Sequence, residues 1–232
     1  MDRIESLDRW LFCFINQTMS NAVFDVLMPF LSRNVLFIPF VVLAVTWMIW
    51  KYRARGLVCV LMLGVIVGPG DKFITNKIKQ AIGRPRPYLV IPETRLPASK
   101  AKQTIDLPPP PVVIPETQLS TGKRVPVGMP SSHAANWGSA GMILFLYFRR
   151  SLWITLPLGA AVSFSRVYNG VHYPADVLVG YLLGATYAAL LVWSFDAAWR
   201  HLGAKYFPRR LEQLPTLIIS SPPGPPVPPG PA

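Results

Sequence analysis

Long stretches without a charged residue divide this chain and are separated by short polar connections. A helix needs about 20 mostly apolar residues to cross a bilayer, and a charge at its centre costs about 2.5–3.5 kcal/mol. The uncharged stretches are residues 34–50, 56–70, 125–148, 151–165 and 177–195. The pattern predicts an all-α fold, a polytopic membrane helix bundle of five to six transmembrane helices. Its five core spans are expected at residues 34–50, 56–70, 132–148, 151–167 and 177–197.

The amino-terminal stretch 10–31 is also apolar, but polar side chains such as Asn16, Gln17 and Asp25 interrupt it. As a sixth span it would have to satisfy these groups inside the bundle, because lipid offers them no partner. As a pair of amphipathic helices it would lie in the membrane interface. Both interpretations stay open for residues 1–33. The acidic start of the chain makes a cleaved signal peptide unexpected.

Basic residues in the connections predict the orientation of the bundle. They gather at residues 51–55, 149–150 and 200–210. With five alternating spans, all three clusters fall on one side, which the positive-inside rule makes cytoplasmic. The membrane domain is then expected over residues 34–200. Residues 201–232 form a proline-rich cytoplasmic tail, disordered from Pro215 onward.

The opposite, extracytoplasmic side carries a proline-rich loop over residues 87–129. A short sequence, Val-Ile-Pro-Glu-Thr, begins at Val90 and is repeated from Val113. Loops of this length without secondary structure are uncommon and often functional. We expect extended, polyproline-like segments in it.

The composition agrees with a membrane protein and excludes other classes. Of 232 residues, 51% are apolar and 15% are charged, with a net charge of +12, whereas soluble domains carry about 25% charged residues. The two cysteines, Cys13 and Cys59, lie in apolar stretches and do not indicate a disulfide scaffold. A nucleic-acid partner is not expected, because the basic residues divide between the orientation clusters and the helix ends on the opposite side.

Residues that could perform chemistry occur at the extracytoplasmic ends of three predicted helices. In the first segment, Lys77 and Arg84 lie two helical turns apart and can project from one face before Pro85 ends the helix. Alone, this could be a basic cluster attracted to lipid headgroups. The second segment precedes a span and reads Pro130, Ser131, Ser132, His133. Its serines could simply cap the helix, or its free N–H groups could bind an anion.

The third segment contains Arg166, His172 and Asp176. His172 and Asp176 are four residues apart, so the carboxylate can reach the imidazole and fix its tautomer. A purely structural His–Asp pair is the alternative. Together, the segments place three cations (Lys77, Arg84, Arg166) and two histidines on one membrane face. This set favours metal-free phosphoryl transfer, because arginine binds phosphate bidentately and a zinc site needs more ligands. No cofactor is predicted.

These motifs resemble the signature of the type 2 phosphatidic acid phosphatase family of membrane lipid phosphatases, which shares its fold with vanadium haloperoxidases. The family pattern is KxxxxxxRP, PSGH and SRxxxxxHxxxD. The first and third parts match at Lys77–Arg84–Pro85 and at Ser165, Arg166, His172 and Asp176. The second departs at one position, since Ser132 replaces glycine. The additional side chain affects the close approach of phosphate to the backbone.

The resemblance implies a two-step reaction. His172 would attack phosphorus to form a phosphohistidine, with Asp176 orienting the ring. His133 would protonate the leaving oxygen and then activate water. The phosphate would be held by Lys77, Arg84, Ser131, Ser132 and Arg166.

The predicted partners are the bilayer and a lipid phosphate of its outer leaflet. The resemblance favours undecaprenyl pyrophosphate as substrate, in the inner membrane of a bacterium with the site on the periplasmic side. Phosphatidylglycerophosphate, phosphatidic acid and lipid A phosphates are alternatives. A non-catalytic lipid-binding membrane protein is the alternative of another class. A haloperoxidase is not expected, because it should be soluble and longer. The oligomeric state stays open.

Overall fold

The hydrophobic stretches of the sequence become helices in the computed structural model, which describes residues 3–33, 37–97 and 126–218. The α-helices are α1 (Arg3–Cys13), α2 (Ala22–Leu31), α3 (Ile38–Gly70), α4 (Asn76–Ile82), α5 (Pro87–Val90), α7 (Ser132–Tyr147), α8 (Leu152–Tyr168), α9 (Pro174–Tyr206) and α10 (Pro208–Gln213). Two short π-helical segments are η1 (Phe14–Thr18) and η3 (Asp71–Thr75), and a short 3-10 helix is η5 (Arg149–Ser151). Within the described residues, β-type pairing is limited to an isolated bridge between Pro85 and Val127. The predicted all-α fold is confirmed.

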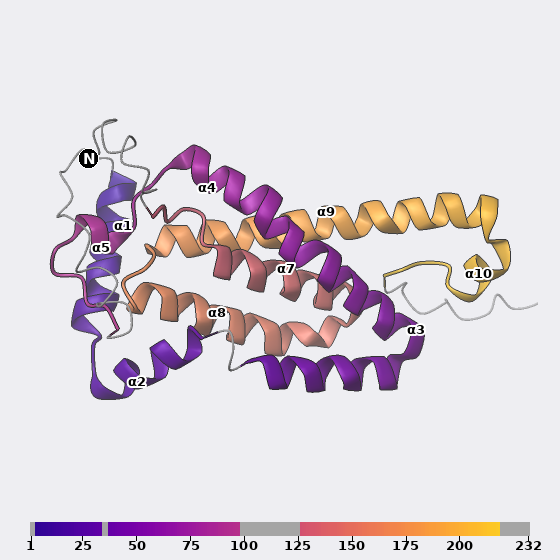
Figure 1. Cartoon of the computed structure of the whole chain (residues 1–232), viewed down its shortest axis with the longest axis horizontal. Coiled ribbons are helices and arrows are strands. Elements are labelled where there is room, and N and C mark those ends of the chain that lie inside the picture. The colour runs from indigo at the N-terminus through magenta and orange to yellow at the C-terminus, as the bar shows by residue number, and fades with distance from the viewer. Residues whose placement is uncertain (1–2, 34–36, 98–125, 219–232) are drawn as a thin grey trace, which may run out of the picture.

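Helix α3 contains the first two predicted spans as the arms of a hairpin (Figure 1). The turn lies at Arg53, whose φ of 50° and ψ of −124° interrupt the helical geometry. Gly56 faces the backbone of Met48 across the turn. A side chain at Gly56 would collide with that backbone, so the close return of the chain requires glycine. The second arm continues through η3 into α4 and ends at the site.

Helix α7 lies at the centre of the bundle, against α3, α8 and α9 (Figure 1). Its contact with α9 is close because small residues face backbone atoms on both sides. Gly138 of α7 faces the carbonyl of Tyr181, and Gly184 of α9 faces the carbonyl of Ala135. Small residues of this kind let membrane helices approach each other. This packing fixes the start of α7 next to the start of α9.

The outer surface of the bundle is apolar. Two described stretches, Ile38–Ile82 and Pro174–Tyr206, are long and apolar enough to cross a membrane. Large apolar side chains point outward from α3, α8 and α9, for example Phe40, Trp153 and Leu182. An exposed apolar surface of this extent indicates a membrane protein. Helices α7 and α8 have only 16 and 17 residues, so the predicted number of five to six spans is not established.

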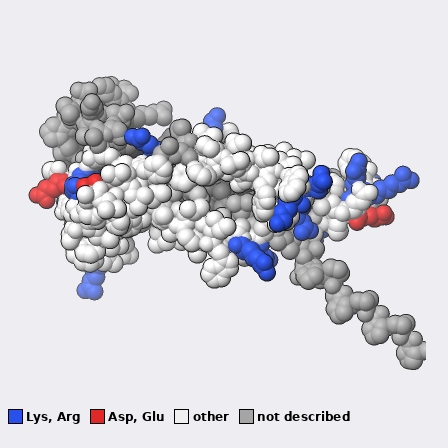
Figure 2. Space-filling model, turned by 90° about the horizontal axis from the view of Figure 1, so that it is seen from below, with Lys and Arg blue, Asp and Glu red and all other residues white. Residues whose placement is uncertain are grey.

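The two ends of the bundle differ in charge and in structure. The turn of α3, η5 and the end of α9 lie at one end (Figure 1). Figure 2 shows Lys and Arg side chains gathered around this end. The three basic clusters therefore share one end, as the orientation argument required. Helices α1 and α2 lie at the opposite end, and their 11 and 10 residues favour the interfacial interpretation of the amino-terminal stretch over a sixth span.

The carboxyl-terminal segment is more ordered than predicted. Helix α9 continues to Tyr206, and α10 and the residues after it fold back along α9. Trp199 Nε1 donates to the carbonyl of Leu214 at 2.8 Å, and Thr216 Oγ1 donates to Asp196 at 2.7 Å. The expected disorder from Pro215 is wrong as far as residue 218, because a buried carboxylate in α9 binds this segment. Residues 219–232, and 98–125 of the proline-rich loop, lie outside the described residues.

Candidate active site

The His172–Asp176 pair lies where the loop after α8 enters α9: His172 belongs to the loop and Asp176 to the first turn of α9. Gly170, with a φ of 70°, turns the chain after α8, and Pro174 begins α9. His172 is 2% exposed, and its Nδ1 lies 3.5 Å from Asp176 Oδ2. The same carboxylate oxygen accepts the backbone N–H of Tyr173 at 3.0 Å. Because Nδ1 faces the carboxylate, Nε2 is the imidazole nitrogen on the side of the ring away from Asp176.

The start of α7 lies beside this pair. The backbone N–H of Ser131 donates to the carbonyl of Asp176 at 2.9 Å. Ser131 is the N-cap residue of α7, yet its side chain makes no capping hydrogen bond. Its buried hydroxyl has no hydrogen-bond partner among the described residues. The helix start thus carries a buried donor and the positive end of a helix dipole, and both favour a bound anion.

Three cations gather around the start of α7. Lys79 Nζ donates to Ser132 Oγ at 2.7 Å, and Ser132 directly precedes His133. Arg166 is 7% exposed, and its Nε has no hydrogen-bond partner within the described part of the chain. Arg86 is held by the carbonyl of Val127 at 3.2 Å. The positive charges of Lys79, Arg86 and Arg166 are close enough to repel one another. A phosphate anion between them would relieve this repulsion.

The structure does not bring Lys77 and Arg84 into this group. Lys77 is exposed and has no hydrogen bond or ion pair with another described residue. Arg84 lies between two carboxylates, at 2.7 Å from Asp8 Oδ2 and 2.9 Å from Asp176 Oδ1. Burial acts to lower the pKa of Arg84, but the hydrogen bond to Asp8 and the two negative charges outweigh it and raise the pKa. Arg84 is therefore a charged bridge between carboxylates.

The sequence contained a signal for this arrangement. The spacing that joins Lys77 to Arg84 and Pro85 recurs two residues later, where it joins Lys79 to Arg86 and Pro87. Sequence reasoning used the first match and missed the second. The structure places the second pair beside Ser132 and Arg166.

Gly128 connects the loop before α7 to the acidic member of the pair. Its N–H donates to the carbonyl of Arg84 at 2.7 Å. A Cβ at this position would lie 2.8 Å from Asp176 Oδ2. Glycine is thus required here by the close approach of the carboxylate.

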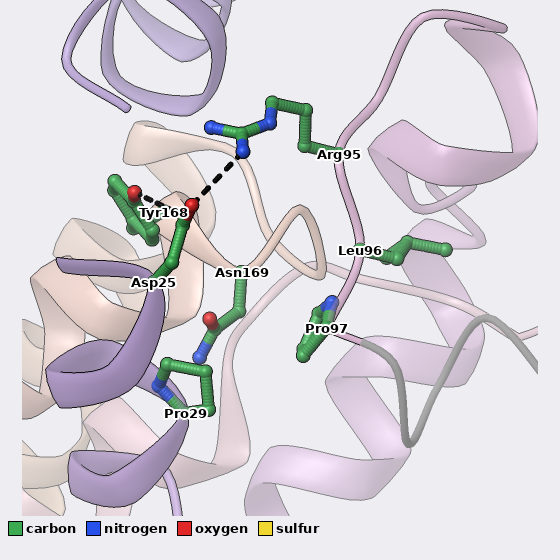
Figure 3. A pocket seen from close by; sticks show the side chains of 7 residues that line it. All are labelled: Asp25, Pro29, Arg95, Leu96, Pro97, Tyr168 and Asn169. Carbon is green, nitrogen blue, oxygen red and sulfur yellow. Dashed lines mark hydrogen bonds and ion pairs between the residues drawn. The ribbon is translucent and has the colours of Figure 1, made fainter. Parts of the chain in front are cut away.

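A separate cavity of about 210 Å³ lies between α2, the loop 91–97 and the end of α8 (Figure 3). Its lining includes the Asp25–Arg95 ion pair, 3.0 Å apart, and Tyr168, which donates to Asp25 at 2.6 Å. None of the predicted site residues lines it. In the described part of the chain, no three His, Cys, Asp or Glu side chains converge in the way a metal site requires.

The sequence model of the PAP2 superfamily matches residues 57–200, which is well over half of the chain and includes all the predicted site residues. The chain belongs to the PAP2 superfamily. Among curated proteins, the bacitracin transport permease protein BcrC of Bacillus licheniformis is 42% identical over 65 residues, which cover 28% of this chain and 32% of the relative. An undecaprenyl-diphosphatase of Sulfolobus acidocaldarius is 42% identical over 64 residues, 27% of this chain and 31% of the relative. The matches span about a third of these relatives' length.

The PAP2 fold is also found in a solved structure, the first transmembrane PAP2 type phosphatidylglycerolphosphate phosphatase from Bacillus subtilis. The two structures share a TM-score of 0.52 and 20% sequence identity, over 82% of this chain and 85% of that chain. At this level of identity the likeness establishes the fold.

Proposed function

We propose that this PAP2 protein is a metal-independent lipid phosphatase that works through a phosphohistidine at His172. The observation that carries the proposal is the arrangement of three mutually repelling cations, Lys79, Arg86 and Arg166, around a helix start next to a buried His–Asp pair. Such a site is built for an anion that reacts with a nucleophile.

In the first step, Nε2 of His172 attacks phosphorus while Asp176 holds Nδ1. The nitrogen–phosphorus bond forms and the bond from phosphorus to the leaving oxygen breaks; this oxygen is the ester oxygen of a lipid phosphate or the bridging oxygen of a lipid diphosphate. His133 gives its proton to the leaving oxygen, which makes it a better leaving group. The three cations and the N–H groups at the start of α7 stabilise the charge that grows on the phosphoryl oxygens.

In the second step, His133 takes a proton from water, and the resulting hydroxide attacks the phosphohistidine. The phosphorus–nitrogen bond breaks, inorganic phosphate leaves, and both histidines return to their starting states. Ser131 contributes its buried hydroxyl as a further donor, whereas Ser132 acts through its hydrogen bond with Lys79. Lys77 and Arg84, the pair first expected to bind phosphate, have no direct role in this scheme.

For the substrate, we propose undecaprenyl pyrophosphate, with phosphatidylglycerophosphate, phosphatidic acid and lipid A phosphates as alternatives. The likeness to an undecaprenyl-diphosphatase supports the first choice. The basic clusters at the other end of the bundle support an outer-leaflet site in a bacterial inner membrane. Single cysteines at positions 90 and 205, in a chain without Cys13 and Cys59, should react with impermeant reagents from opposite sides of the membrane.

Phosphate release from these lipids in detergent micelles tests the activity. The wild type should release phosphate from at least one of them, and His172→Ala should abolish the release while the melting temperature is retained. His201, exposed at the far end of α9, provides the matched control, and His201→Ala should be fully active. Release of phosphate by His172→Ala at the wild-type rate would refute the proposed nucleophile. A folded wild type that binds the lipids and releases no phosphate would instead be a lipid-binding protein.

A further inference from the structure

One carboxylate from the amino-terminal helix reaches the site. Asp8 lies on α1 and is 7% exposed, and it precedes the first residue of the PAP2 match by almost 50 positions. Its Oδ2 accepts from Arg84 at 2.7 Å, and its Oδ1 accepts the N–H of Ala175 at 2.8 Å. A carboxylate this deeply buried is stable only when its partners satisfy it, as these two do.

Both hydrogen-bond partners of Asp8 are also connected to Asp176, one through the backbone and the other through an ion pair. Ala175 belongs to the first turn of α9, directly before Asp176, and its N–H points to Asp8 at the positive end of that helix. Arg84 binds Asp8 with one nitrogen and Asp176 Oδ1 with the other. Asp176 Oδ2 then faces His172 Nδ1. Asp8 is therefore connected to Asp176 by charged hydrogen bonds and by the backbone of α9, and Asp176 Oδ2 lies 3.5 Å from His172 Nδ1.

Aromatic packing keeps this chain of contacts in place. The guanidinium of Arg84 lies 4.1 Å from the centre of the Tyr173 ring. Phe12, one helical turn after Asp8 and fully buried, packs against the same ring at a centroid distance of 5.4 Å. Helix α1 is thus held to the first turn of α9 by a buried contact as well as by charge.

We propose that Asp8 is a positioning residue for the His172–Asp176 pair. It binds one nitrogen of Arg84, so that the guanidinium contacts Asp176 only at Oδ1 and Oδ2 faces the imidazole, and it fixes the turn from which Asp176 projects. Without the charge of Asp8, Arg84 would draw Asp176 more strongly and weaken its hold on His172. Asp8 does not touch the phosphate, so it should affect turnover and leave substrate binding unchanged. The proposal rests on the proposed phosphatase activity.

Asp8→Asn tests the proposal, because the amide keeps an oxygen for the N–H of Ala175 but loses the charge that Arg84 requires. The probe is the lipid of the panel with the highest turnover. Loss of an outer partner that orients a metal ligand costs about 10- to 100-fold. By analogy, kcat should fall by about that factor, while KM stays near the wild-type value. Asp8→Glu, which keeps the charge, should recover part of the lost kcat.

Asp25→Asn is the matched control. Asp25 also holds the amino-terminal segment through an ion pair, with Arg95 at 3.0 Å (Figure 3), but it has no link to Asp176. Its kcat should stay near the wild-type value. Combining Asp8→Asn with Arg84→Gln should lower kcat no further than the more damaging single change, because both act through one contact.

The outcomes separate the two proposals. A wild type without phosphatase activity refutes the proposed function. If the wild type is active, then an unchanged kcat in Asp8→Asn, a change confined to KM, or an equal loss in Asp25→Asn overturns the positioning role. Unfolding of both Asp8→Asn and Asp8→Glu would show that the residue is structural, and this would overturn the role as well.

Discussion

Two neighbouring lysines on one helix should differ greatly in their importance for turnover. Lys79 donates to Ser132 at 2.7 Å beside two arginines, whereas Lys77, two residues earlier, is exposed. We predict that Lys79→Ala loses most of its activity and that Lys77→Ala retains it. The pair is well matched because both changes remove the same side chain from the same helical turn.

The magnitude follows from the number of groups that share the phosphate. Removal of one preorganised donor to a developing oxyanion costs about 100- to 1000-fold in kcat. In Lys79→Ala, Arg86 and Arg166 remain to bind the phosphate, and they are no longer repelled by the charge of Lys79. The loss of kcat should therefore lie near the lower bound of this range. A 100-fold loss corresponds to about 2.7 kcal/mol. Lys77 is exposed and contacts none of the groups at the start of α7, so Lys77→Ala should leave kcat near the wild-type value and change stability by at most about 0.5 kcal/mol.

Initial rates of phosphate release at saturating lipid provide the assay. Both variants should elute as the wild type does in size-exclusion chromatography and should melt at a similar temperature. If Lys77→Ala loses as much activity as Lys79→Ala, then the first of the two overlapping motifs binds the phosphate and the placement of Lys79 here is not the functional one.

Further predictions concern the glycines and the chemistry. Gly184→Val should lower the melting temperature, because overpacking against the carbonyl of Ala135 costs about 1–3 kcal/mol; calorimetry or dye-based melting measures it. Gly128→Ala should lower kcat with little change in KM, since the new Cβ displaces the Asp176 carboxylate; steady-state kinetics would contradict this if only KM rises. Dialysis against EDTA should leave phosphate release unchanged. Vanadate should inhibit competitively with the lipid, and a non-competitive pattern would argue against a shared phosphate site.

The helices of the bundle could be predicted because each depends on a local pattern. Uncharged stretches, with Pro130 before the first of the two, already located α7 and α8 to within a residue or two. The His172–Asp176 contact was equally local, since the two residues are only four positions apart, on either side of the N-cap of α9. Where a span continued beyond its hydrophobic stretch, as α9 does to Tyr206, the ends were missed.

The part played by the amino-terminal helix could not be predicted, because its contacts join residues that are far apart in the chain. Asp8 meets Arg84 and Ala175 across 76 and 167 positions. Asn16 likewise donates to the carbonyl of Tyr168 across 152 positions, at 2.7 Å. No periodicity in residues 3–33 indicates which distant groups they meet. Polar residues of the amino-terminal stretch, such as Asn16 and Asp25, instead make hydrogen bonds with residues at the end of α8.

The choice between the overlapping phosphate motifs depends on where a helix ends. Lys77 and Lys79 lie on α4, where two residues correspond to about 200° of rotation, so only one of them can face the start of α7. The helix ends at Gly83, whose φ of 65° reverses the chain, and Pro85 then pairs with Val127 as an extended segment. In an extended segment, residues two apart project to the same side, so Arg84 and Arg86 both face the site. Arg84 binds Asp8 and Asp176, which leaves Arg86 without a carboxylate partner among the described residues. Because the helix ends at Gly83, and is not continuous from Lys77 to Arg84, we propose Lys79 and Arg86 as the phosphate-binding pair.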